Sequence, residues 1–259
     1  MTLLLTAWMS WLPAKRFVAN DLKEDELRVV TWNVGYFSPV TNKNVRDIDL
    51  DVIASLLTDV TPDVVILQEL ASIEQAQQIT QILGPNWFCH SAKTGHGEQV
   101  IAILSASEFL TTDSFECGGR MTLGASLQTR TNQSLYVVGV HSPHPARGVA
   151  ENIENIKCAL DHATARSEDI RIITGDMNCN FDPNGTGAFY AEILEQYGDG
   201  TIDLGETYYA QTRIDHMFHH PKDLRVTLDS SGMIDLPMRF AKVPGFRDHK
   251  PIVVTYDLK

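Results

Sequence analysis

The sequence predicts an α/β protein in which helices cover the faces of the β-sheets. Short apolar segments alternate along the chain with segments whose apolar residues recur at helical spacing. The strand-like segments are apolar throughout rather than at every second residue, which is typical of strands buried on both faces. We therefore expect sheets that lie between layers of helices.

The first half of the chain begins with a strand at Leu27–Trp32, which a turn at Gly35 ends. Apolar side chains on one side of residues 52–60 predict a helix, and Pro62 closes it. The apolar run Val64–Leu67 then indicates a buried strand. The order is therefore strand, helix, strand.

The second half repeats this pattern, with one further predicted helix over residues 150–160. The predicted strands of this half are Val100–Leu104, Leu135–Val140, Ile170–Thr174, Ile214–Phe218 and Ile252–Tyr256.

Length and composition allow one large core. The chain has 259 residues, 43% of them hydrophobic, and its length does not require a second domain. The formal net charge of -12 argues against a protein that coats nucleic acid through a broad basic face. It does not exclude a nuclease, because a metal site needs a cluster of carboxylates.

The N-terminal residues stand apart in composition. Met1–Pro13 is rich in Leu and Trp but is shorter than the ~20 apolar residues of a transmembrane helix. Lys15 and Arg16 follow the apolar part, whereas a secretory signal begins with its basic residues. Two interpretations stay open: a segment that docks or touches a membrane through residues 1–13, and the remnant of a longer leader.

The four cysteines are Cys89, Cys117, Cys158 and Cys179, and their spacing matches no zinc site. This pattern favours a reducing compartment, so the expected location is cytoplasmic. In an exported protein, one or two disulfides could form instead.

Polar residues follow nearly every predicted strand, and the ends of such strands converge in α/β enzymes. These residues are Asn33, Glu69, His141, Asp176 with Asn178, Asp215, and Asp248 with His249. Any one of the acids alone would be interpreted as a turn or helix-capping residue. Together, Asn33, Glu69 and Asp248 offer the oxygen ligands that Mg²⁺ prefers, with Mn²⁺ as an alternative.

Two histidines lie at strand boundaries beside these acids, which favours proton transfer or phosphate binding over a surface role. Asp215 is placed to orient His249, and Glu98 to orient His141.

A locally basic stretch is the candidate for holding an anionic substrate. It contains Arg239, Lys242, Arg247 and Lys250, with Phe240 and Phe246 between them, and Arg147 follows the HSPHP segment as a second candidate. The competing interpretation is a solvated loop without a binding role.

Six motifs occur in order along the chain: TWNVGYF, ILQEL, HSPHP, TGDMNCN, RIDHMF and RDHKPIVV. Their series resembles that of the endonuclease/exonuclease/phosphatase superfamily, on the side of its deoxyribonuclease I-like branch. The resemblance runs from about Arg28 to the C-terminus. It implies a catalytic domain at residues 27–259, after an apolar segment and spacer at residues 1–26. It also implies a four-layer α/β sandwich, two packed mixed sheets flanked by helices.

The resemblance also implies roles for individual residues. It places metal binding on Asn33, Glu69 and Asp248, phosphate polarisation on Asp176 and Asn178, and acid–histidine pairs on Asp215 with His249 and Glu98 with His141. The chain departs from the family pattern at Met177, where Phe is usual, and at Arg247, where Ser is usual. The segment LASIEQ also lacks the arginine that deoxyribonuclease carries beyond its metal-binding glutamate.

Three functions remain open at this stage. The first is a magnesium-dependent endonuclease that nicks DNA, which HSPHP, Glu98 and the basic stretch favour. The second is a phospholipid or inositol-phosphate phosphoesterase, which the acidic net charge, the missing arginine and the apolar N-terminal segment favour. The third is a binding module without catalysis, which the intact motif residues disfavour. We expect the first, with DNA as the partner, and the sequence leaves the oligomeric state open.

Overall fold

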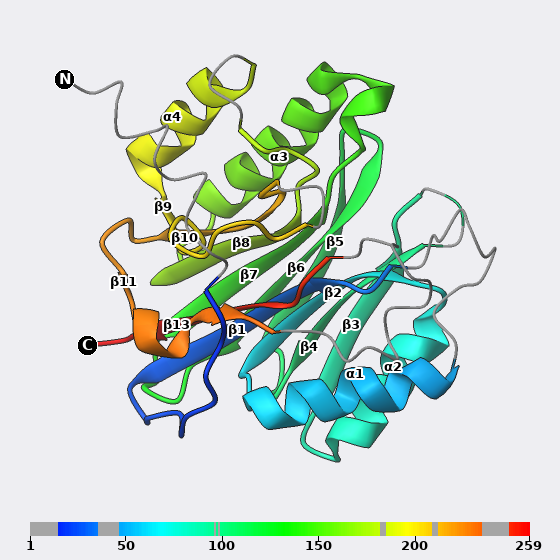
Figure 1. Ribbon diagram of the computed structural model, residues 1–259, viewed down its shortest axis with the longest axis vertical. Helices are drawn as coiled ribbons and strands as arrows, with labels where there is room; N and C mark the ends of the chain where they lie inside the picture. The colour runs from blue at the N-terminus through cyan, green and yellow to red at the C-terminus, as the bar shows by residue number, and fades with distance from the viewer. Residues whose placement is uncertain are drawn as a thin grey trace.

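The computed structural model describes residues 15–35, 47–95, 97, 99–181, 185–208, 212–234 and 249–259. Within them, two β-sheets pack face to face and each carries helices on its outer side (Figure 1). The layers run helices, sheet, sheet, helices, which confirms the predicted four-layer sandwich.

The first sheet has the strand order β11-β13-β1-β2-β4-β3, with β12 beside β13. Strands β1 and β2 are parallel, and the other pairs are antiparallel. The strands are β1 (Glu26–Asn33), β2 (Val64–Leu70), β3 (Phe88–Lys93), β4 (Val100–Ser105), β11 (Arg225–Val226), β12 (Gly232–Met233) and β13 (Ile252–Asp257).

The second sheet has the order β5-β6-β7-β8-β10-β9, and only its pair β7 and β8 is parallel among the described strands. The strands are β5 (Thr111–Cys117), β6 (Arg120–Gln128), β7 (Ser134–His141), β8 (Ile170–Asp176), β9 (Gly198–Asp199) and β10 (Asp215–His220). Both sheets are therefore mixed, as predicted.

The helices cover the two outer faces (Figure 1). α1 (Asp47–Val60) and α2 (Ile73–Leu83) lie on the first sheet, and α3 (Val149–Thr164) and α4 (Gly187–Gln196) lie on the second. Each helical layer contributes its own apolar core, and a third core fills the space between the sheets. That central core is tight at Gly139, where an added Cβ would come within 3.1 Å of the Ile66 side chain. No helix of the described residues is long and apolar enough to cross a membrane.

The described part of the N-terminal region contacts the fold. Phe17 N donates to Met233 O at 2.8 Å, and Met233 N donates to Lys15 O at 2.7 Å, so residues 15–17 pair with β12. The Phe17 ring lies 5.3 Å from the Arg28 guanidinium. The predicted boundary between residues 26 and 27 stays a prediction, and residues 1–14 lie outside the described ranges.

Cys117 and Cys158 form a disulfide between the end of β5 and α3, with their Cα atoms 5.5 Å apart. Disulfides persist in oxidising environments, so this bond runs against the reducing compartment that the cysteine spacing predicts. Cys89 and Cys179 are free thiols. The cytoplasmic location stays a prediction.

Acid is expected to destabilise the protein through His219, a β10 residue that is 3% exposed. Burial lowers the pKa of His219 from 6.5 to about 4, although the charge of Asp199 opposes the shift. The unfolded chain therefore takes up this proton first, and the stability that the neutral ring contributes is full above pH 6.5 and is lost as the pH falls towards 4. The shift corresponds to about 3 kcal/mol.

Urea unfolding at pH 7 and at pH 4.5 measures this effect. The free energy of unfolding of His219→Gln should fall less between the two pH values than that of the wild type. Equal losses in the two proteins would contradict the assignment to His219.

Candidate active site

The polar residues predicted at the strand ends meet around Asp176, the last residue of β8. Asn33, at the end of β1, donates from Nδ2 to Asp176 Oδ2 at 2.9 Å and so joins the two sheets. The backbone N of Asn178 donates to Asp176 Oδ1 at 2.8 Å. The Nε2 atoms of His141 and His249 lie 3.7 and 3.6 Å from Asp176 Oδ2. Four predicted residues are therefore gathered around the carboxylate of a fifth, Asp176.

The parallel pairing of β7 with β8 explains why His141 and Asp176 are neighbours. They are register partners at the ends of the two strands, and Ser142 N continues the ladder by donating to Asp176 O at 2.9 Å. Gly175 lies opposite Val140, with φ of 149°, and an added Cβ would come within 1.9 Å of Val140 O. Only glycine fits there, so the Gly-Asp sequence is required by this close approach of strands.

Asp176 is 1% exposed, and its environment disfavours the ionised form. Burial raises the pKa of Asp176 to about 7; the charge of His249 opposes this shift, and the charge of Asp215 adds to it. Hydrogen bonds from Asn33 and Asn178 lower the pKa by less than burial raises it. A carboxyl with a pKa near neutrality is suited to proton transfer.

The predicted pairing of His249 with Asp215 is present as hydrogen bonds. His249 Nδ1 lies 3.0 and 2.9 Å from the two carboxylate oxygens of Asp215, which is 1% exposed. Since Nδ1 faces the carboxylate, Nε2 is the nitrogen that faces Asp176. The ring of Tyr208 lies 4.8 Å from the His249 ring, a contact that the sequence interpretation missed.

Among the described residues, His141 lies close to two acids. Its Nε2 lies 3.5 Å from Glu69 Oε1 and 3.7 Å from Asp176 Oδ2, which are ion-pair rather than hydrogen-bond distances. The predicted partner, Glu98, lies outside the described residues. His141 therefore lies between the acids of both sheets.

Glu69 owes its position to an irregularity in β2. Pairing with β4 shifts register between Leu67 and Leu70, and Glu69 has a φ of 60°. A bulge of this kind redirects a side chain at a strand end, and strained backbone of this kind gathers at functional sites. The neighbouring Gln68 is the register partner of Asn33, so the two predicted metal ligands of the described chain lie on adjacent strand ends.

Asn178 is also held in the left-handed region, with a φ of 48°. Its Nδ2 donates to Ser142 O at 3.0 Å and to Asp176 Oδ2 at 3.3 Å. Its side chain thus ties the segment after β8 to the segment after β7. In this structure both amide contacts go to protein acceptors, whereas the resemblance implies a donor to phosphate.

Asn152 of α3 is a second residue that the sequence interpretation missed. It is 1% exposed, and its Nδ2 donates to Pro143 O at 2.9 Å and to Met177 O at 2.7 Å. It therefore clamps together the two segments that carry the site residues. The signal in the sequence is a polar residue on the apolar side of the predicted helix.

Several predicted residues cannot be placed. Asp248 and the basic residues Arg239, Lys242 and Arg247 lie outside the described residues, and for Arg147 only the backbone, in the 3-10 helix Pro145–Arg147, is described. Their roles stay predictions.

A divalent cation fits the chemistry of this donor set. Buried carboxylates lie beside one another, and the pKa of Asp176 is raised first by burial and then by the charge of Asp215, two effects that a bound cation opposes. The described residues offer one cluster of three titratable ligands within 4.8 Å of one another: Asp176, Asp215 and His249. It differs from the predicted set of Asn33, Glu69 and Asp248. Since Asp215 and His249 Nδ1 already bind each other, we favour the predicted set as the cation ligands.

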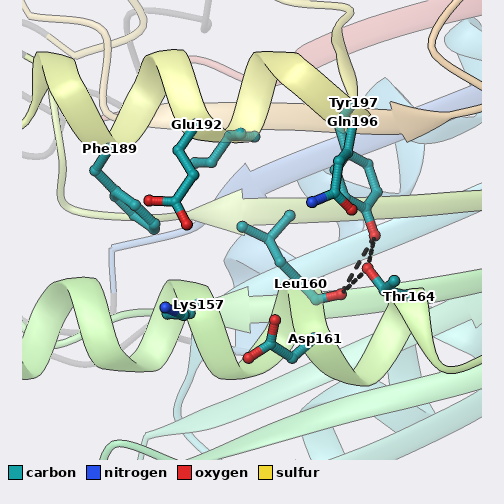
Figure 2. A pocket seen from close by; sticks show the side chains of 9 residues that line it. Lys157, Leu160, Asp161, Thr164, Phe189, Glu192, Gln196 and Tyr197 are labelled. Atoms are coloured by element: carbon teal, nitrogen blue, oxygen red, sulfur yellow. Dashed lines mark hydrogen bonds between the residues drawn. The ribbon is translucent and has the colours of Figure 1, made fainter.

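The hollow between α3 and α4 is separate from this site (Figure 2). Its lining includes Lys157 and Asp161 of α3 and Glu192 of α4, and Tyr197 closes one end by bonding Thr164. No predicted site residue lines it. The predicted site residues therefore lie at the strand ends and not in this hollow.

Comparison with known proteins agrees with this geometry. Residues 30–233 match the model of the endonuclease/exonuclease/phosphatase family. The chain belongs to this family. As a member of this family, it is a metal-dependent phosphoesterase. The match confirms the predicted superfamily and does not resolve the branch within it.

Solved structures of the family share the fold at low identity. A family member from Bacteroides vulgatus matches with a TM-score of 0.73 at 18% identity, over 90% of this chain and 99% of that one. TDP2 from D. rerio, complexed with single-strand DNA product, matches with a TM-score of 0.69 at 21% identity, over 89% of this chain and 98% of that one. A mannosyl-6-phosphatase from Bacteroides thetaiotaomicron VPI-5482 matches with a TM-score of 0.65 at 15% identity, over 88% of this chain and 98% of that one. No curated protein matches the sequence significantly.

Proposed function

We propose that this protein is a divalent-metal-dependent phosphodiester hydrolase that nicks DNA. The observation that carries the proposal is the placement of two imidazoles, His141 and His249, within 3.7 Å of the same oxygen of Asp176. Cleavage of a phosphodiester needs a group that takes a proton from water and a group that gives one to the leaving oxygen. Two histidines around one carboxyl supply both.

Each residue has a proposed part in the reaction. Asp215 holds the Nδ1 proton of His249, so that Nε2 and Asp176, 3.6 Å apart, share the proton taken from water. His141 gives a proton to the leaving oxygen. Asn33 and Glu69, with Asp248, are the proposed ligands of the cation, whose chemistry is to neutralise negative charge on the phosphate.

Two observations support DNA as the substrate. The HSPHP motif resembles the deoxyribonuclease branch, and the structurally similar TDP2 from D. rerio is complexed with a single-strand DNA product. The mannosyl-6-phosphatase shows that the same fold also serves a sugar phosphate. The net charge of -12 keeps a phospholipid or inositol-phosphate substrate as the alternative.

A substrate panel tests the proposal. Supercoiled plasmid, single-stranded oligonucleotide, sphingomyelin and inositol phosphates are incubated with Mg²⁺, Mn²⁺ or chelator. We expect nicked plasmid with Mg²⁺ or Mn²⁺ and none with chelator. His249→Ala should lower the rate by ~100-fold or more, the effect of losing a positioned proton-transfer group.

Two outcomes would contradict the proposal in different ways. Hydrolysis of sphingomyelin or inositol phosphates without plasmid nicking would select the alternative substrate. Nicking that persists in chelator, or at full rate in His249→Ala, would contradict the mechanism.

A further inference from the structure

Thr207 contacts Asp215 and the residue that follows His249. It is fully buried, and its Oγ1 donates to Asp215 Oδ2 at 2.7 Å. Its carbonyl oxygen accepts from the backbone N of Lys250 at 3.0 Å, the residue directly after His249. One residue therefore fixes the acid through its side chain and the histidine's segment through its backbone.

The hydrogen bonds around the Thr207 hydroxyl have only one consistent direction. Its Oγ1 lies 3.2 Å from the backbone N of Ile214 and 3.2 Å from that of Asp215, and both groups can only donate. The single hydroxyl proton is therefore directed to Asp215 Oδ2, which must accept it. Asp215 thus acts as an acceptor on this side.

The orientation of Asp215 bears on the histidine. The Asp215 carboxylate accepts from both Thr207 and His249, so the proton of a neutral imidazole lies on Nδ1 and the ring follows the orientation of the carboxylate. Nε2 then carries the lone pair, on the side of Asp176. Because Asp215 is 1% exposed, bulk water cannot replace the hydroxyl as a donor.

We propose that Thr207 is a positioning residue that orients the Asp215 carboxylate and, through it, the His249 ring. The inference rests on the proposed function, because it assigns His249 Nε2 to proton transfer. Backbone bonds of Thr207, including Thr207 N to Thr212 O at 3.1 Å, do not involve the hydroxyl. A change of side chain therefore removes the bond to Asp215 and leaves these backbone bonds in place.

The test compares Thr207→Val, which keeps the shape and loses the hydroxyl, with Thr207→Ser, which keeps the hydroxyl. A hydrogen bond to a charged group contributes about 1.5–3 kcal/mol, so Thr207→Val should lower kcat by about 10- to 100-fold. KM should stay within about twofold, and Thr207→Ser should retain most of the wild-type kcat. Thr80→Val removes a buried threonine hydroxyl on α2, away from the strand ends, and should leave kcat unchanged.

A second readout needs no substrate. Proton NMR of the metal-free protein should show the Nδ1–H of His249 as a downfield signal in the wild type and in Thr207→Ser, because its hydrogen bond to Asp215 is fixed. The signal should shift upfield or broaden in Thr207→Val, or in Thr207→Ala if the valine variant does not fold, because Asp215 is no longer held by the hydroxyl. If the wild type hydrolyses nothing in the substrate panel, the proposed function fails while the NMR comparison still tests Thr207.

Either of two results would overturn the inference. The first is a hydroxyl-free variant whose His249 Nδ1–H signal is the same as that of the wild type. The second is a Thr207→Ser protein whose kcat falls as far as that of Thr207→Val, since bulk rather than the hydroxyl would then be decisive.

Discussion

Replacing Asp176 by asparagine is expected to lower kcat by about 10³-fold, within the range for loss of a proton-transfer group. The carboxylate accepts hydrogen bonds from Asn33 Nδ2 and from Asn178 N on its two oxygens. An asparagine side chain must present an NH₂ group to one of these two donors, so one bond becomes a repulsive contact. The change also removes the group that we propose shares a proton with His249.

Steady-state kinetics on the substrate found in the panel measure this loss. The matched control is Asp169→Asn, because Asp169 lies just before the opposite end of the same strand. Its carboxylate accepts from Ser134 N at 2.9 Å and from Ser134 Oγ at 2.8 Å. The activity of Asp169→Asn should stay within about twofold of the wild-type activity, because surface substitutions have small effects. Equal losses in the two variants would show that Asp176 matters through stability alone.

The strands that the sequence predicts are those with continuous apolar runs, and the structure contains all of them, from β1 to β13. The elements that it does not predict have other patterns. β5 has exposed and half-buried residues alternating along its length, as an edge strand does, so it contains no apolar run. α2 was recognisable, because Ser72 caps it by accepting from Gln75 N and Gly84 follows its end.

The sequence predicts which candidate residues lie together where their position at a strand end decides it. Asn33, His141 and Asp176 lie where their strands end, so the convergence of strands was enough to place them together. Thr207 and Asn152 differ, because their importance depends on which distant groups their side chains meet. The sequence marks Asn152 as a polar residue on the apolar side of a helix, but it does not tell which groups Asn152 or Thr207 contacts. Those partners are found only from coordinates.

Asp215→Asn is expected to cost nearly as much turnover as His249→Ala, about 10²- to 10³-fold in each case. Thr207 still donates to the oxygen that faces it, so the new amide NH₂ takes the place of Oδ1, which lies 3.0 Å from His249 Nδ1. An NH₂ group there repels a proton on Nδ1 and favours the imidazole tautomer with its proton on Nε2. The ring stays in place in the wrong tautomer, and its Nε2 can no longer take a proton from water.

The double variant Asp215→Asn/His249→Ala distinguishes this explanation from two independent roles. If Asp215 acts only through His249, the double variant should be no slower than His249→Ala, within about twofold, because groups that act as a unit are not additive. The measurement is the single-turnover rate of plasmid nicking by the three variants and by the wild type. If the two losses multiply, Asp215 also acts independently of His249. Its ligand atom lies within 4.8 Å of those of Asp176 and His249, so the independent role would be direct binding of the cation.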